Sequence, residues 1–241
     1  MDALHEQLIF CQRAYALNSL SAAIVHEFNN LMTPVLARAA DALTRDDTDA
    51  RRRALECAVT QIEQAIELSR RIILLAQGKE TRVEPVAVRR AVTNAVAALV
   101  RPPARDGVQL RIEVADDLYA ESDEVLLTQL CLNLLLELRG ALPAASGTIV
   151  IAAHREQDRV RLSFRGHSTD RAAAARAATL ADWSRRNGTA EWDWREVGLN
   201  WSVSAFIAKR FGGSLDARFD EAARELELGV GWRAATPVAV G

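Results

Sequence analysis

Apolar residues recur at alternating steps of three and four along the first 80 residues, which is the spacing of helices that bury one face. Between residues 4 and 43 the chain has no glycine and only one proline, so we expect a single long helix that bends at Pro34. The polar residues at 44–49 predict a turn, and a second helix with the same spacing ends at Gly78. The two segments therefore predict an antiparallel helical hairpin.

The hairpin carries more apolar surface than its two helices can bury on each other. Further apolar residues flank the main stripe: Val25, Met32, Ile66 and Ile73. Two copies of the hairpin can cover this surface by forming a four-helix bundle. We therefore expect a homodimer.

After residue 80 helical and alternating patterns follow one another. Residues 84–100 predict a helix, 108–115 a half-buried strand and 122–142 a capped helix with a broad apolar face. The remaining patterns predict a β-hairpin turning near 155–157, a short helix near 171–181, a helix at 199–211 ended by two glycines, and last strands at 214–219 and 224–238. This order predicts an α/β sandwich of antiparallel strands with helices on one face, hence an α+β protein with domains at 1–80 and 81–241.

Composition narrows the classes of function. The formal net charge is -2 and no stretch reaches the roughly 18 to 20 apolar residues of a membrane span, so neither nucleic acid nor membrane insertion is expected. The cysteines, Cys11, Cys57 and Cys131, are far apart, which argues against a disulfide scaffold and a zinc site. We expect a cytoplasmic protein.

His26 lies on the first helix among polar neighbours. Helical rotation places its ring nearly opposite the stripe formed by Ile24 and Phe28, so we expect it to face solvent. Asn30 shares its face at i+4, and Glu27 is adjacent. An exposed neutral imidazole is a nucleophile near pH 7, and a neighbouring carboxylate can hold one ring tautomer. Taken alone, a helical histidine is more often a surface or core residue without chemistry, but this group of neighbours favours a nucleophile.

A metal site at His26 is disfavoured by the same spacing. One histidine beside one glutamate at i+1 cannot face a common ion, and the other histidines lie in other segments. We therefore expect no metal there.

The stretch SLSAAIVHEFNNLMTPVL resembles the phosphoacceptor helix of two-component sensor histidine kinases. The resemblance rests on a histidine, an acid, a phenylalanine and two asparagines in register, followed by Thr-Pro. It implies that His26 is phosphorylated, that Glu27 polarises it and that Asn30 orients water for dephosphorylation of a response regulator. It also implies that the hairpin is the dimerisation and histidine phosphotransfer domain.

The resemblance continues to the C-terminus, where the order of elements looks like a GHKL-type (Bergerat) ATP-binding domain. LCLNLLLELRGALP looks like its N box, VRLSFRGHSTD lies where the G1 box is expected, and GLNWSVSAFIAKRFGGSL looks like its G2 box. Asn133 is retained, but Glu137 stands at the magnesium-binding asparagine, Gly166 stands at the adenine-binding aspartate, and Gly198 begins a G2 box whose second glycine is Asn200. The resemblance thus marks a degenerate nucleotide site at Asn133, Glu137, Gly166 and Gly198.

Four tryptophans fall in or just after the segment that would form the lid of this site: Trp183, Trp192, Trp194 and Trp201. Each can simply pack a loop. As a group they suggest the hypothesis that aromatic bulk fills the cavity that a nucleotide would occupy.

Three functions fit these features. The first is a dimeric histidine phosphotransferase that relays phosphoryl groups through His26 between receiver domains of response regulators, with no cofactor of its own. The second is a sensor histidine kinase that autophosphorylates His26 with ATP and magnesium, with a separate sensor kinase or sensing subunit as a candidate partner. The third is a non-catalytic scaffold that sequesters a receiver or a kinase. An intact phosphoacceptor motif beside altered nucleotide motifs favours the first.

Overall fold

The computed structural model describes residues 25–44, 47–76, 83–99, 102–142, 147–168, 171–186 and 194–236. The chain divides into two compact units, Met1–Gln77 and Gly78–Gly241. The predicted domain boundary at residue 80 lies outside the described residues. No described helix combines the length and apolar character that a membrane span requires.

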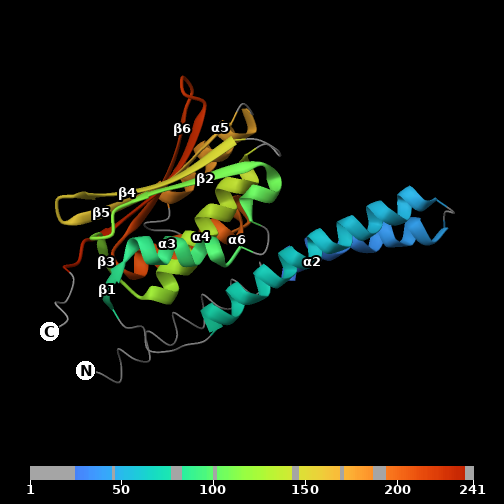
Figure 1. The fold of residues 1–241 in the computed structure, drawn as a ribbon, viewed down its shortest axis with the longest axis horizontal. Helices are drawn as coiled ribbons and strands as arrows, with labels where there is room; N and C mark the ends of the chain where they lie inside the picture. The colour runs from blue at the N-terminus through green and yellow to red at the C-terminus, as the bar shows by residue number, and fades with distance from the viewer. Residues whose placement is uncertain are drawn as a thin grey trace. The chain divides into compact units, whose positions relative to one another are not determined.

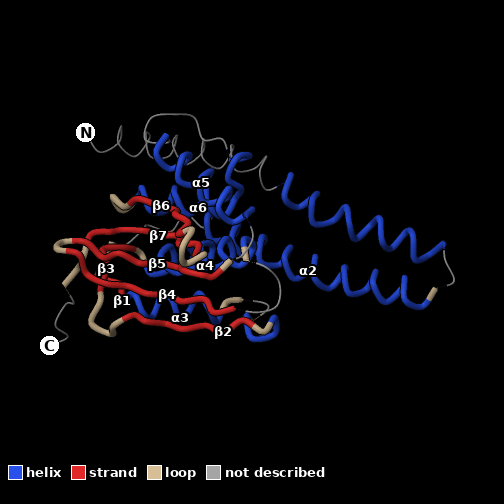
Figure 2. Tube along the Cα trace, turned by 90° about the horizontal axis from the view of Figure 1, so that it is seen from above, coloured by secondary structure: helices blue, strands red, loops and turns tan. Residues whose placement is uncertain are grey.

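The first unit contains two antiparallel helices (Figures 1 and 2). The first helix occupies 25–44 and continues through Pro34, and the second, α2, spans Thr48–Ala76. Asp47 caps the start of α2, because its Oδ1 accepts the backbone N–H of Asp49 at 2.9 Å. The predicted helical hairpin is confirmed for these residues, whereas the predicted start of the first helix at residue 4 lies outside them.

The second unit is built on a mixed five-stranded sheet in the order β2-β4-β5-β7-β6. Its strands are β2 (Val108–Val114), β4 (Gly147–Glu156), β5 (Arg159–His167), β6 (Ser214–Asp220) and β7 (Glu225–Arg233). The prediction of antiparallel strands is wrong for one pair, since β2 runs parallel to β4. A parallel pair needs a long crossover connection, and the chain between these two strands contains helix α4.

The helices of this unit are α3 (Val88–Ala97), α4 (Glu124–Ala141), α5 (Arg171–Arg186), α6 (Trp194–Arg210) and the short 3-10 helix η1 (Pro103–Asp106). Figure 1 shows α3, α4 and α6 against one side of the sheet. The predicted cap of α4 is present, because Asp123 Oδ1 accepts the backbone N–H groups of Val125 and Leu126 at 3.0 and 3.1 Å. The α+β class is confirmed.

The predicted helix at 84–100 is wrong in its first turn. Residues Glu84–Ala87 form strand β1, which pairs antiparallel with β3 (Tyr119–Ser122) in a separate two-stranded sheet. Helix α3 begins only at Val88, whose N–H donates to the carbonyl oxygen of Leu118 at 3.0 Å. A partner more than 30 residues away along the chain therefore decides the structure of this segment.

The core of the second unit lies between the sheet and α4. Phe164 of β5 and Leu228 of β7 are opposite each other in register and fully buried. Leu134 and Cys131 of α4 are also fully buried. Burial raises the pKa of the Cys131 thiol far above its ordinary value, because the thiolate would lose its hydration.

This burial predicts selective thiol labelling. In a Cys11→Ser variant, Cys57, which is half-buried on α2, should react with a thiol reagent in the folded protein, whereas Cys131 should react only after unfolding. The measurement is the number of thiols labelled per chain with and without denaturant. A Cys57→Ser replacement in the same background should remove the native signal. Two reactive thiols in the folded protein would contradict the assignment of Cys131 to the core.

Candidate functional site

His26 and Asn30 lie one turn apart on the first helix, and both are exposed. Asn30 Nδ2 is 3.1 Å from His26 Nδ1, so the two side chains predicted to share a face are in hydrogen-bond contact. Glu27 is also exposed. The structure therefore brings together the imidazole and the amide and leaves the ring open to solvent.

The contact with Asn30 is coupled to the tautomer of the His26 ring. When the amide nitrogen of Asn30 donates to Nδ1, a neutral ring carries its proton at Nε2. When the amide turns by 180° and presents its oxygen, Nδ1–H becomes the donor, and a neutral ring then carries its lone pair at Nε2. The orientation of the Asn30 amide is therefore coupled to the position of the proton on the ring.

The other histidines of the described residues are engaged elsewhere. His154 Nε2 lies 2.8 Å from Glu156 Oε1, and His167 Nδ1 lies 3.2 Å from the carbonyl oxygen of Ala223. Within the described ranges, no group of three or more His, Cys, Asp or Glu side chains is arranged to hold a metal ion.

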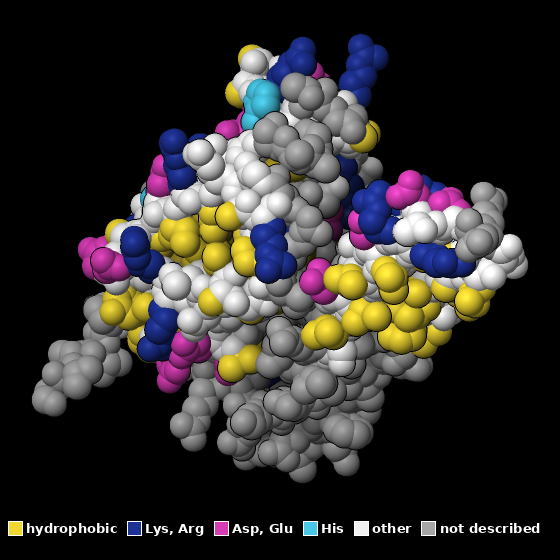
Figure 3. All heavy atoms as spheres, turned by 45° about the vertical axis from the view of Figure 1, so that its right-hand side comes forward, with side chains coloured by type: hydrophobic (Ala, Val, Ile, Leu, Met, Phe, Trp, Pro, Cys, Tyr) yellow, Lys and Arg dark blue, Asp and Glu magenta, His cyan; other side chains and the backbone are white. Residues whose placement is uncertain are grey.

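An apolar stripe runs along α2. It consists of four exposed side chains at steps of four, three and four: Leu55, Val59, Ile62 and Ile66. Val25, Phe28 and Leu36 are exposed on the first helix, and Figure 3 shows hydrophobic side chains gathered on one face of the hairpin. Apolar groups at this density are typical of a surface that another chain covers.

In the second unit, Glu137 on α4 is paired with Arg176 on α5. Arg176 NH2 and Nε lie 2.6 and 2.8 Å from Glu137 Oε1, and the Glu137 side chain is only 10% exposed. Arg176 NH2 also donates to the carbonyl oxygen of Val197 at 2.6 Å. The carboxylate at the position that the sequence resemblance assigns to a magnesium ligand therefore binds a guanidinium, which a metal ion there would have to displace.

The other positions of the predicted nucleotide site are also engaged. Asn133 is fully buried, and its Oδ1 accepts from Gln129 Nε2 at 2.8 Å. Its Nδ2 has no hydrogen-bond partner in the described part of the chain. The side chain of Leu142 covers Gly166, because a Cβ at Gly166 would lie 2.6 Å from Leu142 Cδ1. An aspartate at this position would need Leu142 to move.

Helix α6 is interrupted at Gly198, whose φ of 75° and ψ of 171° are not helical. Glycine adopts this conformation without the strain that a side chain would add. Trp201, one turn later, is fully buried and donates from Nε1 to Ser184 Oγ at 3.2 Å. Trp183 is also buried. Trp192 and the side chain of Trp194 lie outside the described residues, so the aromatic filling of a nucleotide cavity stays a hypothesis.

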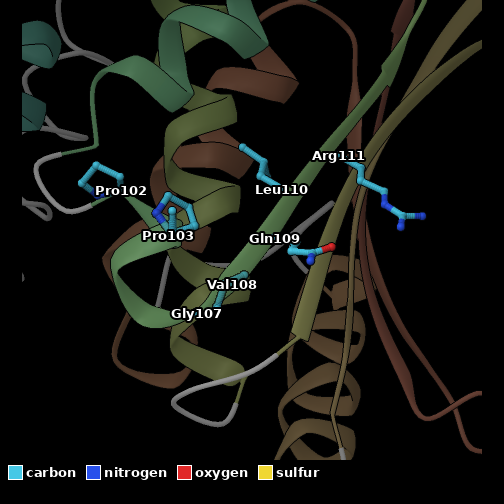
Figure 4. Close-up of a pocket in the computed structure, with 8 residues that line it drawn as sticks. Pro102, Pro103, Gly107, Val108, Gln109, Leu110 and Arg111 are labelled. Atoms are coloured by element: carbon cyan, nitrogen blue, oxygen red, sulfur yellow. The ribbon is translucent and has the colours of Figure 1, made fainter.

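A cavity of about 590 Å³ lies on another part of the second unit, along η1 and the edge strand β2. Figure 4 shows Pro102, Pro103 and Leu110 at its wall. None of the predicted site residues lines it.

Sequence reasoning did not identify Arg176 or Leu142. Arg176 is 39 residues from Glu137, in an alanine-rich and arginine-rich segment where several arginines are equivalent by pattern. A signal was present in Glu137 itself, since a carboxylate on the broad apolar face of a predicted helix requires a cationic partner.

No protein-family model matches the chain. Among solved structures, the complex of histidine kinase ThkA with response regulator protein TrrA matches with a TM-score of 0.64 at 14% identity, covering 96% of this chain and 66% of that chain. A bacterial phosphotransferase matches with a TM-score of 0.56 at 14% identity, covering 90% and 96%. The Acinetobacter baumannii histidine kinase AdeS matches with a TM-score of 0.54 at 12% identity, covering 86% and 97%. The chain therefore has the fold of the sensor histidine kinases with a GHKL-type ATPase domain.

Proposed function

We propose that this protein is a dimeric histidine phosphotransferase of two-component signalling, which relays phosphoryl groups between receiver aspartates through His26. The observation that carries the proposal is the exposed imidazole of His26 in contact with the Asn30 amide. This pair lies in the sequence motif that resembles a phosphoacceptor helix. Its exposure is what a large protein substrate requires.

The contacts at Glu137 and Gly166 support a relay rather than an ATP-dependent kinase. A magnesium nucleotide would need the Glu137 carboxylate that Arg176 binds. Freeing this carboxylate would break charged hydrogen bonds, each of which contributes about 1.5 to 3 kcal/mol to stability. A relay protein needs no nucleotide, since the phosphoryl group reaches it already activated on the partner.

The apolar stripe on α2 supports the homodimer. Burying a fully exposed leucine, valine or isoleucine contributes about 1.5 to 3 kcal/mol, and Leu55, Val59, Ile62 and Ile66 are between 43% and 69% exposed. Four such side chains on each of two chains can therefore supply a substantial part of a dimerisation free energy. A second hairpin packed in register would form the four-helix bundle.

The fold comparisons support the class of partner. One similar structure is a histidine kinase in complex with a response regulator, and another is a bacterial phosphotransferase. We therefore propose receiver domains of response regulators as the partners of this chain.

The chemistry at His26 is a reversible displacement at phosphorus. The lone pair of Nε2 attacks the phosphorus of a receiver's aspartyl phosphate, a P–N bond forms, the P–O bond breaks and aspartate leaves as a carboxylate. For this step the Asn30 amide turns so that its oxygen, in place of the nitrogen that now contacts Nδ1, accepts the proton on Nδ1. A second receiver's carboxylate then attacks the phosphorus, a new P–O bond forms, the P–N bond breaks and the neutral imidazole leaves. The receiver supplies the metal and much of the transfer geometry.

The expected result is phosphorylation from a receiver and not from ATP. The full chain is incubated separately with a phosphorylated receiver domain and with ATP labelled at the γ-phosphate, each with magnesium, and the acid-labile label on the chain is measured. Label should appear with the phosphorylated receiver alone. Label from ATP on His26 would make the protein an active kinase, and no label from any cognate receiver would favour the scaffold.

A further inference from the structure

We infer that the guanidinium of Arg176 holds α5 against α4 and against the start of α6. It occupies the place where the fold family binds a metal and nucleotide. The inference concerns the second unit alone and does not depend on the chemistry at His26. It follows from the acceptors that surround one guanidinium.

Arg176 binds acceptors from two other helices. Its Nε and NH2 contact the Glu137 carboxylate of α4, at 2.8 and 2.6 Å. Its NH2 and NH1 contact the carbonyl oxygens of Val197 and Glu196 on α6, at 2.6 and 3.5 Å. A guanidinium presents its donors in a planar fork, so one side chain can serve acceptors on two elements, whereas an ammonium is a single point of charge.

The break in α6 explains why carbonyl oxygens are available to Arg176. Gly198 has non-helical backbone angles, and the helical hydrogen bonds that would span this residue are interrupted. Carbonyl oxygens of the preceding turn must then find other donors, because a buried unpaired carbonyl is costly. The Arg176 guanidinium supplies such donors to Glu196 and Val197.

The environment of the pair makes it stronger than an ordinary surface ion pair. The side chains of Glu137 and Arg176 are 10% and 30% exposed. A second ion pair, from Arg186 of α5 to Glu196 of α6, is more exposed, at 52% and 36%, and is therefore more strongly screened by solvent. Arg176 thus links α5 to α4 through the Glu137 carboxylate and to α6 through two carbonyl oxygens.

A magnesium ion and Arg176 would compete for one carboxylate. A cation placed at Glu137 would also lie beside the guanidinium, and the two positive charges would repel each other. The residues present therefore do not fit the metal and nucleotide of the fold family.

The first test replaces Arg176 with alanine and follows thermal unfolding. The melting temperature should fall by roughly 5 to 10 °C, because a nearly buried carboxylate loses its partner. Amide hydrogen exchange at 196–200 should accelerate about tenfold or more. Arg176→Lys should recover only part of both losses. The matched control is Arg185→Ala on the same helix, whose side chain is 75% exposed and which should leave both measurements unchanged.

Two further measurements make the inference falsifiable even where the alanine variant folds poorly. In a Glu137→Gln background, Arg176→Lys should lower the melting temperature clearly less than it does in the wild type, because the carboxylate that Arg176 binds is no longer present. Millimolar magnesium and ATP should leave the melting temperature of the wild type unchanged. The inference is overturned if both Arg176 variants melt and exchange as the wild type does. It is also overturned if the effects of the Arg176 and Glu137→Gln substitutions are additive, or if magnesium and ATP raise the melting temperature of the wild type. Label transfer from a receiver to His26 is measured separately and tests only the relay.

Discussion

Replacing His26 with glutamine should abolish acid-labile labelling by a phosphorylated receiver domain. A glutamine amide has a similar polar surface but no ring nitrogen lone pair to attack phosphorus. The side chain is exposed, so the free energy of unfolding should change by no more than about 0.5 kcal/mol. Label incorporation measures the effect, and light scattering with circular dichroism shows whether oligomeric state and fold are kept.

The other two described histidines provide matched controls for this result. His154→Gln and His167→Gln remove imidazoles that contact Glu156 and the Ala223 carbonyl. Both variants should accept label as the wild type does. Label retained by the His26 variant would show that another residue accepts the phosphoryl group. Label lost in a folded His154 or His167 variant would point to that histidine instead.

Replacing Trp201 with alanine should lower the free energy of unfolding of the second unit by about 3 to 5 kcal/mol. The indole is fully buried at the start of the regular part of α6, and its removal leaves a large cavity. It also removes the donor to Ser184 Oγ. Urea unfolding followed by far-ultraviolet circular dichroism measures the change.

Two variants calibrate this loss. Trp201→Phe retains most of the apolar volume and should lower the free energy of unfolding less than the alanine variant does. Val125→Ala truncates a side chain that is 51% exposed, and its effect should lie within about 0.5 kcal/mol. If Trp201→Ala unfolds at the same urea concentration as the wild type, the indole does not pack the core of this unit.

Local patterns in the sequence were sufficient for several elements of the fold. The hairpin helices follow from the repeated spacing of apolar residues, and α4 follows from its cap at Asp123 and its apolar face. The contact between His26 and Asn30 follows from one turn of helix, because residues at i and i+4 are neighbours whatever surrounds them.

Features that depend on distant pairing could not be predicted in this way. From the sequence alone, β1 resembles the first turn of a helix, and it is a strand because it pairs with β3. Strand β3 is too short to show an alternating pattern. The parallel register of β2 and β4 is set by the path of the chain through α4. The ion pair between Glu137 and Arg176 depends on how α4 and α5 pack, which periodicity in either helix does not reveal.

The Glu137–Arg176 pair also restricts the evolutionary paths open to this chain. A mutation that places asparagine at 137 leaves the guanidinium without its carboxylate, and a mutation that removes Arg176 takes the cationic partner from a nearly buried carboxylate. An aspartate at 166 meets the Leu142 side chain. Each of these single substitutions disturbs a neighbour that a second substitution would have to adjust, so Glu137 and Arg176 are expected to change together.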